Sequence, residues 1–97
     1  MLTRLLKLIS DALDDSCFVI QVVDGSVRLT KGKAPDAFLR DLSGICKEEN
    51  LTSGALRGKR QWTYVRLAIS PEIPGHLQQR LRNIWHFHEP SFRTDLL

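Results

Sequence analysis

With 97 residues the chain has room for one small domain, which can hold a modest core together without disulfide bridges or metal ions. Apolar residues make up 42% of the sequence and charged residues 26%, a mixture that excludes a disordered tail. The formal net charge of +3 is uneven: residues 1–50 carry seven Lys and Arg against eight Asp and Glu (−1), and residues 51–97 carry seven against three (+4).

The first segment, MLTRLLKLISDALDD, is amphipathic, and its apolar residues recur at helical spacings of three and four. We expect an amphipathic helix and linker over residues 1–16. The segment is too short and too charged to span a bilayer, which takes about 20 apolar residues, and it lacks the apolar core of a signal peptide. We expect its apolar face to pack on its own domain, on a second copy or on a protein partner, in preference to a membrane surface. That face comprises Leu2, Leu5, Leu6, Ile9 and Leu13.

The two cysteines, Cys17 and Cys46, form no CxxC motif and lie near no histidine pair at metal-ligand spacing. Without a secretory leader, such a pair is typical of two buried thiols in a reducing compartment. We therefore expect a cytoplasmic protein.

Strand-like runs then alternate with helical patterns. FVIQVV is followed by Asp24-Gly25, a dipeptide typical of a tight hairpin turn, and then by VRL. After Pro35, which suits a first helical turn, three apolar residues repeat with spacings of four and three: Phe38, Leu42 and Ile45.

The second half repeats this order. Val65 and Leu67 align with Val27 and Leu29, Gly58 suggests a turn before them, and Pro74 precedes a second helical pattern formed by Leu77, Leu81 and Ile84. We expect an α+β domain over residues 17–88, in which a tandem ββα repeat forms a four-stranded antiparallel sheet with both helices on one face. EPSFRTDLL, residues 89–97, is predicted to be a flexible tail.

Strand alternation predicts which residues face away from those helices. If Val27, Leu29, Val65, Leu67 and Ile69 face inward, their neighbours face outward, because successive side chains of a strand alternate. The outer face would then be basic and aromatic, comprising Arg28, Thr30, Trp62, Tyr64, Arg66 and Ala68.

From Phe18 to Trp85 the chain resembles a small bacterial family catalogued as domain of unknown function 3634. The most distinctive piece of the resemblance is QQRLRNIW, residues 78–85. Family members often carry an apolar, membrane-like segment ahead of this domain, where the present chain has the shorter, charged MLTRLLKLISDALDD. The resemblance implies a bacterial origin and a compact domain, and it assigns no catalytic residue.

No enzymatic motif is found. The sequence contains no GxxxxGK[ST], GxGxxG or GxSxG. His86 and His88 are two residues apart, whereas helical zinc sites use histidines four apart, and His76 and Glu72 have no nucleophile beside them. We therefore expect no catalytic residue, no metal site and no cofactor.

Cations interleaved with aromatic side chains are what single-stranded nucleic acid needs, because phosphates pair with the charges and bases stack on the rings. We therefore predict a non-enzymatic module that binds RNA or single-stranded DNA. The alternative is a structural or scaffold protein that self-associates, or docks on a protein partner, through the N-terminal helix or the sheet face. The candidate nucleic-acid contacts are Arg28, Arg57, Lys59, Arg60, Trp62, Tyr64 and Arg66.

Overall fold

The computed structural model describes residues 16–96, and the statements below concern this part of the chain. The helix predicted at the N-terminus lies outside it and stays a prediction. The elements follow one another as β1 (Phe18–Val23), β2 (Ser26–Gly32), α2 (Asp36–Glu48), β3 (Ser53–Arg60), β4 (Val65–Ile69) and α3 (Gly75–Leu96).

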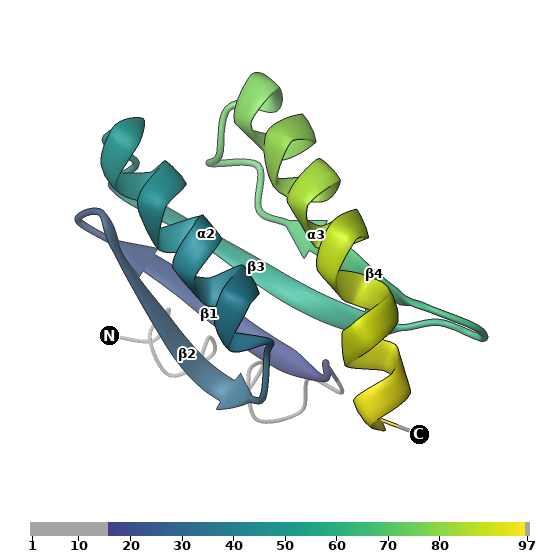
Figure 1. Cartoon of the computed structure of the whole chain (residues 1–97). Coiled ribbons are helices and arrows are strands. Elements are labelled where there is room, and N and C mark those ends of the chain that lie inside the picture. Colours follow the sequence, from purple (N-terminus) through teal and green to yellow (C-terminus); the bar gives the residue numbers. More distant parts are fainter. Residues whose placement is uncertain (1–15, 97) are drawn as a thin grey trace, which may run out of the picture.

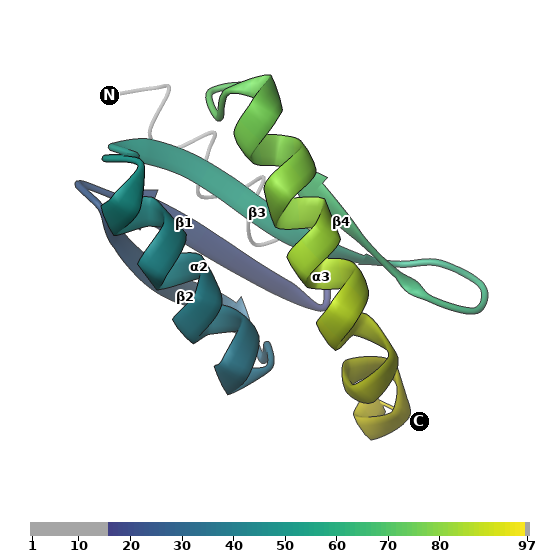
Figure 2. The ribbon, with the colours of Figure 1, turned by 45° about the horizontal axis from the view of Figure 1, so that its top comes forward.

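The four strands form one sheet in the order β2-β1-β3-β4, and each neighbouring pair is antiparallel. Helices α2 and α3 lie side by side on the same side of this sheet (Figures 1 and 2). The α+β class and the four-stranded antiparallel sheet with two helices are thus confirmed. The order strand, strand, helix occurs twice, but the halves differ in detail: α2 has 13 residues and α3 has 22.

The first hairpin closes at the predicted dipeptide. Asp24 and Gly25 both have positive φ, 51° and 78°, and they connect Val23 directly to Ser26 in the paired strands. Two consecutive positive φ angles define a type I′ turn, whose twist matches that of the strands it joins.

The second hairpin differs from the prediction that placed its turn at Gly58. Strand β3 continues through Gly58, which pairs with Leu67, and the turn lies at residues 61–64. A Cβ atom at Gly58 would lie 2.2 Å from the ring of Phe18, so the glycine is required by packing and not by a turn. Trp62 and Tyr64, which we had expected on a strand, consequently belong to the turn.

The core lies between the sheet and the two helices. Four aromatic rings at its centre pack edge to face, with centroid separations of 5.0 to 5.7 Å: Phe18, Phe38, Trp85 and Phe92. The predicted core residues that are buried are Phe38, Leu42, Ile45, Val65, Leu67, Leu77 and Leu81.

Four residues predicted to face inward are less buried than expected: Leu29, Val27, Ile69 and Ile84. Leu29 lies opposite Ile20, and paired residues share a face of the sheet, yet it is 40% exposed because β2 is an edge strand. Val27, on the same edge strand, is only partly buried. In α3, Ile84 is partly buried as well, and its neighbour Trp85 takes the central core position.

The prediction of a flexible tail is wrong for residues 89–96, because α3 continues to Leu96 with Pro90 inside it. Proline removes one helical hydrogen bond and normally ends or kinks a helix. Here the turn beyond Pro90 places Phe92 in the core, where it is 6% exposed, and this burial offsets the cost of the proline.

Within residues 16–96, no helix combines the length and the apolar character that crossing a bilayer requires.

Candidate nucleic-acid interface

Four of the predicted contacts lie on the face of the sheet opposite the helices. Arg28 pairs with Gln21, Arg57 with Ala68, and Lys59 with Arg66. These positions alternate with core residues along their strands, so their side chains leave the sheet on the other side. Arg28 and Arg66 are exposed, and Arg57 and Lys59 are partly buried.

Arg28 is not part of a common site with Arg66. The two residues lie on β2 and β4, the opposite edges of the sheet, which are separated by three strand spacings or roughly 14 Å. They also lie toward opposite ends, because Arg28 is close to the Asp24-Gly25 turn and Arg66 follows the turn at 61–64. Arg28 therefore does not belong to the interface described next.

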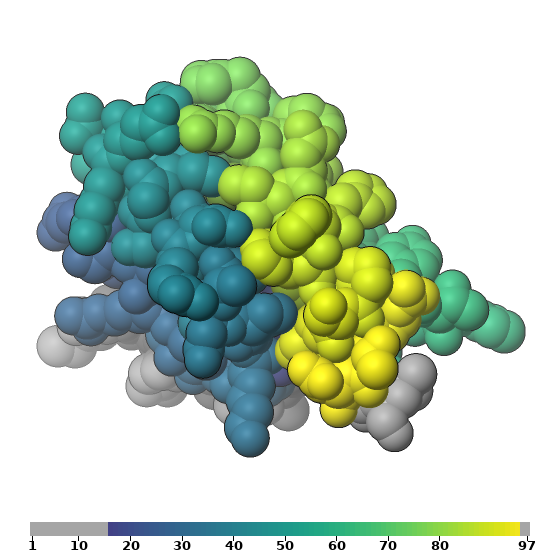
Figure 3. All heavy atoms as spheres, in the orientation of Figure 1, coloured from purple at the N-terminus to yellow at the C-terminus, as the bar shows by residue number. Residues whose placement is uncertain are grey.

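Four of the other predicted residues lie at the end of the β3–β4 hairpin, whereas Arg57 and Lys59 lie farther back along β3. We call residues 60–66 the β3–β4 tip, and it projects from the body of the molecule (Figure 3). The indole of Trp62 is 101% exposed, Tyr64 is 46% exposed, and Arg60 and Arg66 are exposed on either side of the turn. Two aromatic and two cationic side chains thus lie within seven consecutive residues.

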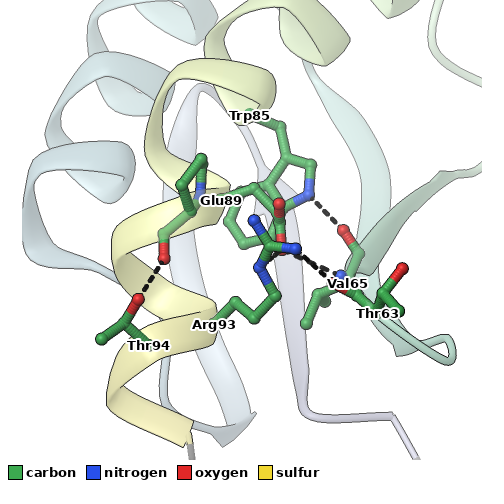
Figure 4. Close-up of polar contacts among 7 residues, drawn as sticks. Thr63, Val65, Trp85, Glu89, Arg93 and Thr94 are labelled. Atoms are coloured by element: carbon green, nitrogen blue, oxygen red, sulfur yellow. Dashed lines mark hydrogen bonds and ion pairs between the residues drawn. The ribbon is translucent and has the colours of Figure 1, made fainter.

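Arg93 fixes the tip from the side, although sequence reasoning did not predict it. Its guanidinium donates to the main-chain oxygen of Thr63 and lies 3.4 Å from Oε2 of Glu89 (Figure 4). Within the turn, the main-chain N–H of Gln61 donates to the oxygen of Tyr64 at 2.8 Å. These contacts restrain the main chain of the turn.

Two further side chains of α3 hold the start of β4. Trp85 Nε1 donates to the main-chain oxygen of Val65 at 2.8 Å, and Glu89 Oε2 accepts from the N–H of Val65 at 3.1 Å (Figure 4). Val65 begins an edge strand, so these main-chain groups would otherwise have no ladder partner. Glu89 is 8% exposed, and its two contacts account for a carboxylate at this depth.

A groove of about 190 Å³ lies between β4 and α3 beside the tip. Its buried floor is formed by Val65, Leu67, Trp85 and Glu89. Its exposed rims are formed by Tyr64, Arg66, Arg82 and His86.

Two other polar residues named from the sequence have structural roles. His88 lies in α3, and its Nε2 is 2.9 Å from Oδ2 of Asp41 in α2. Cys46 packs in the core, where burial raises the pKa of its thiol above the usual value and keeps it protonated at neutral pH. In residues 16–96 no three His, Cys, Asp or Glu side chains come close enough to hold a metal ion.

A family model described as "Protein of unknown function (DUF3634)" matches residues 2–95, which confirms the resemblance and extends it on both sides of Phe18–Trp85. No curated protein and no solved structure matches the chain.

Proposed function

We propose that this chain, which belongs to the DUF3634 family of proteins of unknown function, is a non-enzymatic cytoplasmic module that binds RNA or single-stranded DNA at the β3–β4 tip. The observation that carries the proposal is the exposed indole of Trp62. A large apolar ring wholly in water contributes nothing to the core, and it is suited to a base that stacks on it.

The tip supplies the other requirements of a single strand. Tyr64 offers a second ring, two residues from Trp62 in the sequence, for another base to stack on. Arg60 and Arg66 place cations on both sides of the rings, within reach of the phosphates that join those bases. Because Arg93 restrains the main chain at Thr63, less backbone entropy is lost on binding.

Fluorescence anisotropy of labelled oligothymidylate or oligouridylate of about twelve nucleotides tests the proposal. Replacing Trp62→Ala should weaken binding about tenfold or more, since one stacked base is worth about 1–3 kcal/mol. Raising salt from about 50 to 200 mM should weaken binding of the unaltered protein roughly sevenfold if two phosphates pair with Arg60 and Arg66.

The chain offers matched controls for both side-chain types. Phe87 is 81% exposed but lies on α3, so Phe87→Ala should leave the affinity unchanged. Arg28→Ala should likewise have little effect, whereas Arg66→Ala should weaken binding and reduce its salt dependence. Equal affinity of the Trp62→Ala and Phe87→Ala proteins would contradict binding at the tip.

A second candidate function is docking on a protein partner through the sheet. This function is favoured by a specific observation: main-chain N–H and C=O groups along the outer edge of β4 point away from the sheet.

A further inference from the structure

The hydrogen-bonding pattern of the β3–β4 ladder shows which main-chain groups of β4 point outward. Ser70 N–H donates to the oxygen of Ala55, and Gln61 N–H donates to the oxygen of Tyr64, so both pairs are hydrogen-bonded pairs. Such pairs alternate with non-bonded pairs in an antiparallel ladder. Val65, Leu67 and Ile69 therefore direct their N–H and C=O groups away from β3.

Only the first of these three residues is covered by α3. Both main-chain groups of Val65 bond to Trp85 and Glu89. Within residues 16–96, the outward N–H and C=O groups of Leu67 and Ile69 make no hydrogen bond to a turn or to a side chain. Two donors and two acceptors are thus presented at the spacing of a strand, as in other sheets that bind an extended peptide by adding a strand.

The groove next to Leu67 selects the charge of what binds there. Its rims carry Arg66 on β4 and Arg82 and His86 on α3. Its one acidic residue, Glu89, is already bonded to Val65 and Arg93. A strand that enters this groove is therefore favoured if it carries carboxylates, and a second copy of the chain is disfavoured because it would bring the same cations.

We propose that an extended acidic segment of a partner protein adds as a fifth strand beside β4, pairing with Leu67 and Ile69. Its side chains alternate between the two faces of the sheet, so those on the α3 side lie toward Arg82 and His86 and those on the other side lie toward Arg66. The apolar floor at Leu67 and Trp85 receives a small aliphatic side chain of that segment. The groove shares Tyr64 and Arg66 with the tip, but Trp62 and Arg60 do not line it, so strand addition does not require nucleic-acid binding at the tip.

The test uses the full chain and a fluorescent peptide of about seven residues, a typical strand length. Pairs of valines alternate with pairs of glutamates in this peptide, so that both faces of the strand carry carboxylates. Binding should slow hydrogen exchange at the amides of Leu67 and Ile69 about tenfold or more, because both would become ladder donors. Two control peptides separate the contributions of main-chain hydrogen bonds and of charge. A peptide in which every backbone amide is N-methylated keeps the negative charge but has no N–H donors. A peptide with lysine in place of glutamate keeps the donors but has the opposite charge. Both should bind about tenfold more weakly or not at all.

Protein variants then distinguish the groove from the tip. Arg82→Glu should weaken peptide binding about tenfold, whereas Arg28→Glu on the opposite edge and Trp62→Ala should not change it. Equal binding of the N-methylated peptide, or unchanged exchange at Leu67 and Ile69 in the complex, would overturn strand addition. Loss of oligonucleotide binding but not of peptide binding in the Arg82→Glu protein would assign the groove to nucleic acid and overturn the proposal. Dimerisation through the β4 edge, detected by light scattering, would assign the groove to a second copy of the chain.

Discussion

Replacing Phe92→Ala should lower the free energy of unfolding by about 3–5 kcal/mol, the range for removing a buried aromatic ring. The ring of Phe92 lies 5.6 Å from that of Phe18 and 5.7 Å from that of Trp85, measured between centroids, and it is 6% exposed. Its loss would open a cavity under the last turns of α3 and remove the burial that offsets Pro90. Urea unfolding followed by circular dichroism measures the change.

Phe87→Ala is the matched control, since the same residue type lies on the same helix but is 81% exposed. It should change the stability by no more than about 0.5 kcal/mol. Similar stabilities of the two variants would show that the C-terminal turns of α3 do not pack on the core. That result would agree with the flexible tail predicted from the sequence and not with the structure.

Replacing Gly58→Ala should destabilise the protein by about 1–3 kcal/mol, the cost of overpacking a core. The added methyl group would lie 2.2 Å from the ring of Phe18. That ring is fully buried and held between Trp85 and Phe92, so it cannot move aside cheaply. The same unfolding measurement applies.

Gly44→Ala provides the control for this substitution. Gly44 lies in α2, and a Cβ atom there would have nothing within 4 Å. Alanine should therefore stabilise the protein by about 0.5–1 kcal/mol, because it has the higher helix propensity. A Gly58→Ala protein as stable as the unaltered one would contradict the position of Gly58 under Phe18.

The strands and helices could be predicted from the sequence where one local signal determines the structure. Asp24-Gly25 specifies a type I′ turn by backbone sterics alone, and Phe38, Leu42 and Ile45 mark one face of a helix. Gly58 was misread because the same residue type serves both turns and close packing. Only the position of the Phe18 ring, 40 residues away in sequence, distinguishes these roles.

The end of α3 was missed for a similar reason. Pro90 is a strong local signal for the end of a helix. The signal for its continuation is weaker, because Phe92 follows Leu77, Leu81 and Trp85 at helical spacings of four and seven. With a tail predicted over residues 89–97, Arg93 and Glu89 cannot be assigned to a site. The cations and rings of the tip were predicted, but the separation of Arg28 from them follows from the strand order, which places β2 and β4 at opposite edges.

The most direct test of binding at the tip uses Trp62 itself as the reporter. The chain has two tryptophans, and Trp85→Phe leaves Trp62 alone while keeping an aromatic ring in the core. Titration of this protein with oligothymidylate should quench the tryptophan emission saturably, and the quenching should fall with added salt, because a base stacks on the indole and phosphates pair with Arg60 and Arg66. The Trp62→Phe protein, whose remaining Trp85 is 4% exposed, should show no quenching. Emission from Trp62 that stays constant throughout the titration would contradict the proposed function.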